Sequence, residues 1–163
     1  MFLFSLNIIP LIMKQINLNL ERPEIFRKME ELVRDAFWDK YSPGCCEHLV
    51  VHNLRTSENA IKDLCFIANF NNELVGGIWY AKASIRHNGN AETPVLTMGP
   101  IAVRPDMQGM GIGSKLIRHT MQLAENRACA IIIYGNPSYY SQFGFKPGSD
   151  FGITDATGTF CPA

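Results

Sequence analysis

Hydrophobic and polar residues alternate over several short stretches of the chain, at the spacing typical of half-buried β-strands. One further run, from Ala130 to Tyr134, is apolar without polar alternation, which is typical of a central strand buried on both faces. The pattern therefore predicts strands at residues 14–20, 63–70, 74–85, 95–103, 130–134 and 143–145, with room for one more short strand between residues 151 and 161.

Apolar residues three and four positions apart predict two longer helices. The first follows Glu21-Arg22-Pro23-Glu24, because proline and acidic residues suit a first helical turn. Its expected buried stripe is Ile25, Met29, Leu32, Val33, Ala36 and Phe37. The second helix runs from about Ile112 to Asn126, and its expected core face is Ile112, Leu116, Ile117, Met121, Leu123 and Ala124. Shorter helices are expected at residues 47–54 and 138–142.

The order of these elements predicts an α/β (α+β) fold with a mixed, mostly antiparallel central sheet flanked by helices. Asn88-Gly89 is a strong hairpin signal between the third and fourth strands. Gly99-Pro100 interrupts the fourth strand, and because proline cannot donate to a strand ladder, we expect a β-bulge there. Such a bulge would separate the strand from its neighbour and leave backbone groups free for a ligand.

Length and charge indicate one globular domain with no general affinity for polyanions. The chain has 163 residues, of which 47% are hydrophobic and 18% charged. Residues 14–163 are read as a single domain and residues 1–13 as an N-terminal extension, with Met13 as a candidate initiator and a packed strand as the alternative. The formal net charge of zero disfavours nucleic acids and membranes as partners, and the apolar start is too short to span a bilayer.

The cysteine pattern gives no sign of a metal centre. Five cysteines are an odd number, and their spacing fits no zinc motif. Cys65 and Cys129 lie in apolar runs and are expected to be buried thiols, whereas Cys45-Cys46 carries only a weak metal or redox signal. Free thiols favour a reducing, cytoplasmic location.

Glycines at alternate positions precede the second long helix, in the segment Gln108-Gly109-Met110-Gly111-Ile112-Gly113. The first N–H groups of a helix have no internal partner and carry partial positive charge, so such a loop is a cradle for an anion, above all a phosphate. The spacing misses the dinucleotide pattern, and Gly113-Ser114-Lys115 has its last two residues in the wrong order for a P-loop. A plain glycine-rich turn is the alternative.

Three segments together resemble the GNAT N-acetyltransferase superfamily. The glycine segment matches its Q/R-x-x-G-x-G/A signature, residues 99–105 look like its bulged fourth strand, and residues 139–145 look like its Y-x-x-x-G-F segment. The resemblance extends from about Lys14 to Phe145 and implies the GNAT fold, with acetyl-CoA (coenzyme A) as cosubstrate. It implies coenzyme binding by Ile101, Ala102, Val103, Gln108, Gly109, Met110, Gly111, Ile112, Gly113 and Ser114.

The resemblance also implies distinct roles within that set. Backbone amides from Gln108 to Ser114 would bind the pyrophosphate, Ile101 and Val103 would pair with the pantetheine arm like an added strand, and the Val103 N–H would stabilise the thioester oxyanion. Lys115, Arg118 and Arg104 are the candidates to bind the 3′-phosphate of the coenzyme. For each of them, a solvent-exposed charge with no ligand is an equally good interpretation.

Tyr140 stands four residues before Gly144 and, by the resemblance, is the general acid that protonates the departing sulfur. Tyr139, Phe143 and Phe145 are expected to be packing residues. The reaction implied is direct attack of a primary amine on acetyl-CoA. No acid stands on the bulged strand where many relatives carry a glutamate, so Glu92, His87 and Asp106 are weak candidates for the base, and a water-mediated route is at least as well supported.

Several alternatives stay open from the sequence. A non-catalytic acyl-CoA-binding module is the competing function. The acceptor is a small-molecule amine or a protein amine; Asp35, Asp39 and Glu47 are candidates to attract it, and a homodimer is one expected assembly. The family normally ends in a further strand after the one near Phe145, so the domain is expected to be short of its last strand or to be completed by a partner.

Overall fold

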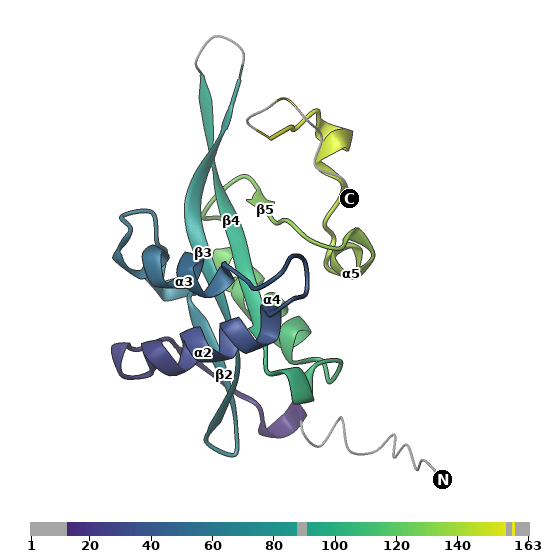
Figure 1. The fold of residues 1–163 in the computed structure, drawn as a ribbon. Helices are drawn as coiled ribbons and strands as arrows, with labels where there is room; N and C mark the ends of the chain where they lie inside the picture. The colour runs from purple at the N-terminus through teal and green to yellow at the C-terminus, as the bar shows by residue number, and fades with distance from the viewer. Residues whose placement is uncertain (1–12, 88–90, 156–157, 159–163) are drawn as a thin grey trace.

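The computed structural model describes residues 13–87, 91–155 and 158 of the chain. Its centre is a five-stranded sheet of order β1-β2-β3-β4-β5, antiparallel throughout except for the parallel pair β4 and β5 (Figure 1). The strands are β1 (Asn17–Leu20), β2 (Phe66–Phe70), β3 (Glu73–Arg86), β4 (Glu92–Val103) and β5 (Ile131–Ile132). The helices are α2 (Phe26–Phe37), α3 (Glu47–Thr56), α4 (Ile112–Ala124) and α5 (Pro137–Tyr140).

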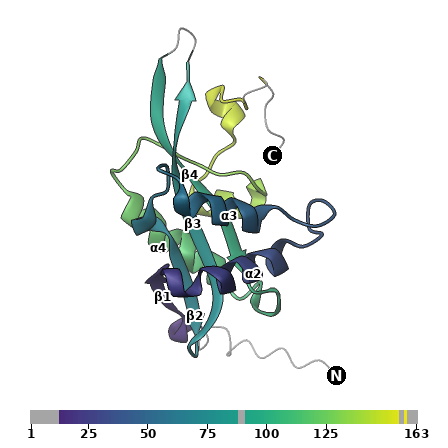
Figure 2. The ribbon, with the colours of Figure 1, turned by 60° about the vertical axis from the view of Figure 1, so that its left-hand side comes forward.

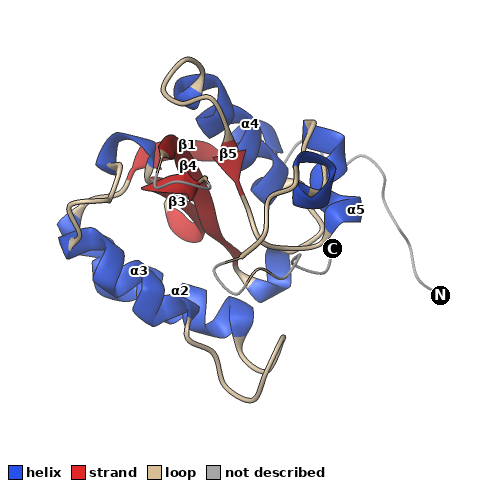
Figure 3. Ribbon diagram, turned by 90° about the horizontal axis from the view of Figure 1, so that it is seen from above, coloured by secondary structure: helices blue, strands red, loops and turns tan. Residues whose placement is uncertain are grey.

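Helices cover both faces of the sheet. Figures 2 and 3 show α2 and α3 on one face and α4 on the other. The predicted stripe of α2 is confirmed, because Met29, Leu32, Val33 and Ala36 are buried against the sheet and Ile25 and Phe37 pack at its border. No helix among residues 13–87 and 91–155 is long and apolar enough to cross a membrane.

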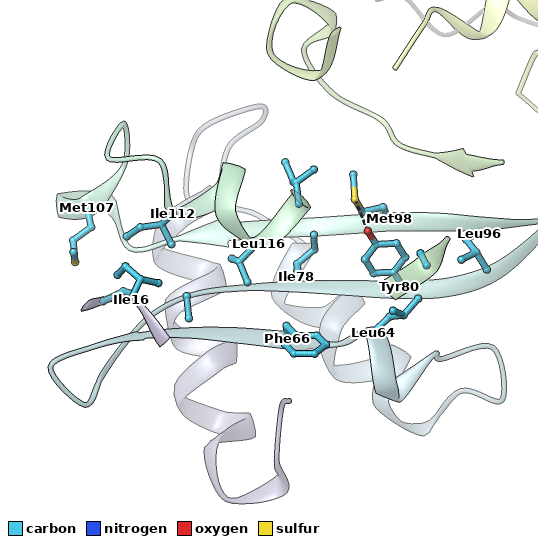
Figure 4. Packing of buried hydrophobic residues seen from close by; sticks show 14 residues of the cluster. Ile16, Leu64, Phe66, Ile78, Tyr80, Leu96, Met98, Met107, Ile112 and Leu116 are labelled. Atoms are coloured by element: carbon cyan, nitrogen blue, oxygen red, sulfur yellow. Dashed lines mark hydrogen bonds between the residues drawn. The ribbon is translucent and has the colours of Figure 1, made fainter. Parts of the chain in front are cut away.

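The larger hydrophobic core lies between the sheet and α4 (Figure 4). Side chains alternate along β3, so Ile78 and Tyr80 face α4 while Trp79 faces α2. The buried Tyr80 hydroxyl lies 2.9 Å from Met98 Sδ and 3.0 Å from Thr120 Oγ1, so it is not left without a partner. Ile112, Leu116 and Ile117 of α4 are fully buried. The predicted core face of α4 is thus confirmed except at Leu123, which is exposed.

The predicted bulge is present at Gly99-Pro100. Ile78 of β3 pairs with Ile101, but Tyr80 pairs with Met98, so two residues of β4 stand opposite the single Trp79. The predicted hairpin between β3 and β4 agrees with their antiparallel pairing, while its turn, Asn88-Gly89, falls outside the described residues.

Two of the predicted strands begin later in the structure than the sequence indicated. The strand expected at 14–20 begins only at Asn17, because Met13 to Gln15 are helical, and the strand expected at 63–70 begins at Phe66 after a 3-10 turn at Lys62–Leu64. The polar residues Lys14, Gln15 and Asp63 fitted the alternating pattern, which does not distinguish a short helical turn from the start of a strand.

The prediction that residues 130–134 form a central, doubly buried strand is wrong. β5 is two residues long, half-buried, and stands last in the order of the described sheet. No strand forms at 143–145, where a 3-10 turn (Ser141–Phe143) precedes Gly144. Cys129 is exposed, not buried, while Cys65 is buried as expected. Any strand between residues 151 and 161 lies partly outside the described residues.

Candidate active site

The two edges of β4 differ sharply beyond the bulge. Toward β3, β4 is paired from Glu92 to Val103, but toward β5 it pairs only at Leu96 and Thr97. After β5 the chain leads away from β4 to α5 (Figure 1). From Met98 onward, β4 therefore presents an edge with no strand beside it among the described residues.

Backbone groups of Ile101 and Val103 face this open edge. The Arg104 N–H donates to Val75 O of β3 at 2.9 Å, and in an antiparallel strand the direction of N–H and C=O alternates with each residue. The groups of Ala102 therefore face β3, and those of Ile101 and Val103 face away from it. The Val103 carbonyl accepts a hydrogen bond from Gln108 Nε2 at 3.0 Å, which fixes the start of the glycine loop to the end of β4.

Two buried apolar side chains hold the glycine loop in place. Met107, directly before the loop, and Ile112, within it at the first position of α4, are both buried in the core (Figure 4). Between them the backbone takes left-handed conformations at Gly109 (φ 77°) and Gly111 (φ 89°), which glycine adopts without the strain that a side chain would add. Gly111 is the residue directly before α4.

The loop presents a row of free donors. From Gly109 to Ser114, no backbone N–H has a hydrogen-bond acceptor within the described part of the chain; the next one, of Lys115, closes the first helical turn on Gly111 O at 3.0 Å. The Gln108 N–H, which was predicted to belong to this row, instead donates to Pro105 O at 3.4 Å. Six consecutive donors at a helix N-terminus, in a loop that glycines leave uncovered, fit a phosphate group.

The open edge of β4 and the first turn of α4 meet at Gly113. A Cβ at Gly113 would lie 3.1 Å from the Tyr139 hydroxyl, 3.7 Å from Val103 Cγ2 and 4.0 Å from Ile101 Cγ2. Glycine therefore keeps the space between these side chains and the helix clear. Ile101, Val103 and Gly113 thus border one continuous surface from the β4 edge into the loop, whereas the predicted coenzyme residues Ala102 and Ile112 have buried side chains.

The three candidate cations differ in what they already bind. Lys115 Nζ donates to Met13 O (2.9 Å) and Ile16 O (2.7 Å), and Arg104 pairs with Glu73 and Asp106. Arg118 is exposed and lies over the Phe143 ring at 5.0 Å.

A hollow of about 390 Å³ beside α4 is lined by two of these cations, Lys115 and Arg118, and not by Arg104. Its lining includes Gly111, Ser114, Lys115, Arg118 and His119. Arg118 is the arginine that lines this hollow, and among the described residues no carboxylate forms an ion pair with it.

Tyr140 belongs to the short helix α5, and its ring packs edge-to-face on Tyr139 and Phe145. Asn136 Oδ1 caps this helix by accepting from the Ser138 N–H at 2.9 Å. The Tyr140 hydroxyl has no hydrogen-bond partner among the described residues. Burial raises the pKa of Tyr140 to about 12, with smaller contributions from Tyr139 and Tyr41.

The weak candidates for a catalytic base are all engaged elsewhere. Glu92 accepts from Ser84 at 2.8 Å and from Arg86, and these hydrogen bonds lower its pKa. His87 bonds Thr93 in the same exposed part of the β3–β4 hairpin, and Asp106 pairs with Arg104.

The acidic residues proposed to attract an amine also have partners. Asp39 accepts from the Gly44 N–H, Glu47 from the Cys46 N–H, and Asp35 from Arg34. Cys45 Sγ lies 3.4 Å from His48 Nδ1, but no group of three metal-ligating side chains occurs among the described residues.

Sequence reasoning missed the position of Tyr139. It was expected to be a packing residue, yet it is 37% exposed, and its hydroxyl lies 3.3 Å from Ser114 Oγ at the start of α4. The role of the Gln108 side chain on Val103 was also missed. Neither contact has a local signal, because each joins residues brought together only by the fold.

Comparison with known proteins agrees with this geometry. Residues 29–145, most of the chain, match the model of the Acetyltransferase (GNAT) family. The chain is 31% identical over 100 residues to an uncharacterized N-acetyltransferase of Escherichia coli (strain K12), YjhQ, a match covering 60% of this chain and 54% of that protein. The chain thus spans about half the length of this curated relative.

Two solved structures share the fold. A GNAT family acetyltransferase from Brucella melitensis, in complex with acetyl-CoA, superposes with a TM-score of 0.71 at 29% identity, over 80% of this chain and 82% of that one. The GNAT family N-acetyltransferase YhbS from Escherichia coli, in complex with CoA, gives a TM-score of 0.68 at 22% identity, over 83% and 71%. The family and the fold expected from the three sequence segments are therefore confirmed: the chain belongs to the Acetyltransferase (GNAT) family.

Proposed function

We propose that this protein is an acetyl-CoA-dependent N-acetyltransferase that moves an acetyl group directly to a primary amine. The observation that carries the proposal is the continuity of the open β4 edge with six free N–H donors at the start of α4. An extended arm ending in a pyrophosphate matches that surface in both shape and charge. The family match and the two structures with coenzyme bound support the same assignment.

In this proposal the backbone holds the coenzyme. The N–H groups of Gly109 to Ser114 bind the pyrophosphate, and the outward backbone groups of Ile101 and Val103 bind the pantetheine arm as a neighbouring strand would. Val103 already uses its carbonyl for Gln108, so its N–H and that of Ile101 are the donors available to a carbonyl oxygen. When bound, acetyl-CoA supplies an activated acyl group, so no covalent enzyme intermediate is required.

Tyr140 is proposed as the general acid at the coenzyme sulfur. Its raised pKa of about 12 keeps the hydroxyl protonated at neutral pH, which is the form that a general acid requires. An ordinary tyrosine, with a pKa of about 10, is already a weaker acid than a thiol, whose pKa is about 8.5, and the raised pKa of Tyr140 widens this difference. We therefore expect the proton to move in the same step in which the bond to sulfur breaks.

The amine must lose a proton before or during attack. An alkylamine with a pKa of about 10.4 is neutral in only about one molecule in 2,500 at pH 7. The weak base candidates Glu92, His87 and Asp106 are already hydrogen-bonded in exposed positions. A water-mediated route is the proposal that fits this site.

A coupled assay tests the function. Purified protein is mixed with acetyl-CoA and a panel of amines, small molecules and a lysine peptide, and free thiol is measured with a thiol reagent. Amine-dependent thiol release, with the acetylated amine identified by mass, is expected. Tight acetyl-CoA binding without release for any amine would instead support the non-catalytic acyl-CoA-binding module.

A further inference from the structure

Tyr139 lies outside every role assigned so far, yet its hydroxyl is placed at the centre of the site. It projects from α5 and reaches the first turn of α4, where it lies 3.3 Å from Ser114 Oγ. The position of a Gly113 Cβ would be 3.1 Å from the same oxygen. The hydroxyl thus stands beside the free N–H donors of the loop.

The side chains around Gly113 show which part of the site this is. Val103 Cγ2 and Ile101 Cγ2, from the open edge of β4, approach the same glycine. Tyr139 therefore stands at the point where the β4 edge passes into the glycine loop. In the proposed function this is where the pantetheine arm joins the pyrophosphate.

The Tyr139 ring is fixed from the other side. It packs edge-to-face on Tyr140 at 5.0 Å and on Phe143 at 5.5 Å between ring centroids. These contacts hold a phenol with only two rotatable side-chain bonds, so little conformational freedom is lost when its hydroxyl binds a ligand.

We propose that Tyr139 is a coenzyme-binding residue, whose hydroxyl donates a hydrogen bond to the pyrophosphate end of the pantetheine arm. The proposal rests on the proposed function for the identity of the ligand. It assigns the two neighbouring tyrosines to different tasks: Tyr139 to affinity for the coenzyme and Tyr140 to the chemical step. Ser114 Oγ, at hydrogen-bond distance, orients the Tyr139 hydroxyl before the ligand arrives.

Calorimetric titration of Tyr139→Phe with CoA and with 3′,5′-ADP tests the assignment. Phenylalanine keeps the ring contacts and removes only the hydroxyl. We expect CoA to bind about 10- to 100-fold more weakly, the usual effect of losing a hydrogen bond to a charged group, while 3′,5′-ADP, which lacks the pantetheine arm and its phosphate, binds as in the wild type. Ser138→Ala removes a hydroxyl from the same helix and is expected to change neither affinity.

Two results would overturn the assignment. If Tyr139→Phe weakens CoA and 3′,5′-ADP equally, or leaves CoA binding unchanged, the hydroxyl does not contact the arm. Failure of the wild type to bind CoA at all would instead remove the proposed function.

Discussion

Two polar regions of this molecule are organised in opposite ways. Around Arg55, opposite charges are buried and fully paired: its guanidinium bonds both carboxylate oxygens of Glu21, and the Trp79 indole N–H donates to the same carboxylate at 3.0 Å. Around Gly111, a row of backbone donors has no acceptor among the described residues. The first region satisfies every group and stabilises the fold, whereas the second leaves groups unsatisfied and is available to a ligand.

The contrast also separates the two faces of the sheet. The Arg55 network joins α3 to the turn after β1 and to β3, and a further bond from Arg55 to Glu30 includes α2. The glycine loop joins β4 to α4 on the opposite face. Variants in the two regions should therefore fail differently, one set in stability and the other in binding.

The largest expected effect is that of Gly113→Glu on coenzyme binding. A Cβ there would crowd the Tyr139 hydroxyl, and a carboxylate would place negative charge among the donors meant for a phosphate. We expect affinity for acetyl-CoA to fall more than about 1,000-fold, on the order of 4 kcal/mol. Ser149→Glu, which adds the same carboxylate at an exposed position of the 3-10 turn Gly148–Phe151, is the control. Unchanged affinity in folded Gly113→Glu would refute the placement of the pyrophosphate.

Next in size is the loss of stability in Arg55→Met. The Arg55 and Glu21 side chains are only 7% and 5% exposed, so removing the arginine leaves a buried carboxylate unpaired. The free energy of unfolding should fall by about 3–5 kcal/mol in a urea titration. Arg86→Met removes an exposed pair with Glu92 and should cost less than about 1 kcal/mol. If the free energy of unfolding falls by a similar amount in both variants, the buried network contributes no more to stability than the exposed pair.

Replacing Tyr140 should lower turnover while preserving binding. Tyr140→Phe is expected to reduce kcat about 100-fold, the lower range for a general acid, with little change in acetyl-CoA affinity. Because the pKa of Tyr140 is raised to about 12, its proton is retained up to about pH 11 and lost as pH rises through 12. The kcat profile between pH 6 and 10 should therefore show no falling limb from this residue. Equal rates in both proteins would remove Tyr140 from the mechanism.

The smallest expected effect is on coenzyme affinity, and it distinguishes the roles of Arg118 and Lys115 in α4. Arg118→Met should weaken CoA about 10-fold and leave dephospho-CoA unchanged, if Arg118 binds the 3′-phosphate. Lys115 is tied to the carbonyls of Met13 and Ile16, so Lys115→Met should alter the affinities for CoA and dephospho-CoA by the same factor. If Lys115→Met no longer binds CoA more tightly than dephospho-CoA, while Arg118→Met still does, the two assignments would be reversed.

Local patterns in the sequence were enough to predict the parts of the site that depend on one segment. The bulge at Gly99-Pro100 and the glycine loop each follow from backbone rules that apply within a few residues. The pairing of Arg55 with Glu21, 34 positions away, and the contact of Tyr139 with Ser114 could not be read this way, because neither residue carries a local sign of its partner.

The run at residues 130–134 shows a different limit. Its apolar, β-branched residues indicated a strand correctly, but composition could not show that only Ile131 and Ile132 would pair with β4. That early end of pairing, not the strand itself, creates the open edge on which the candidate site depends. Register and strand length are tertiary properties, and here they decide where a ligand can enter.

Calorimetric titration of the wild-type protein with acetyl-CoA, with NADH as a control, tests the central claim most directly. The free donors of Gly109 to Ser114 and the open edge of β4 predict saturable binding of one acetyl-CoA per chain and no binding of NADH. Absence of acetyl-CoA binding by folded protein, or equal binding of NADH, would contradict the claim that this loop and edge form a coenzyme A site.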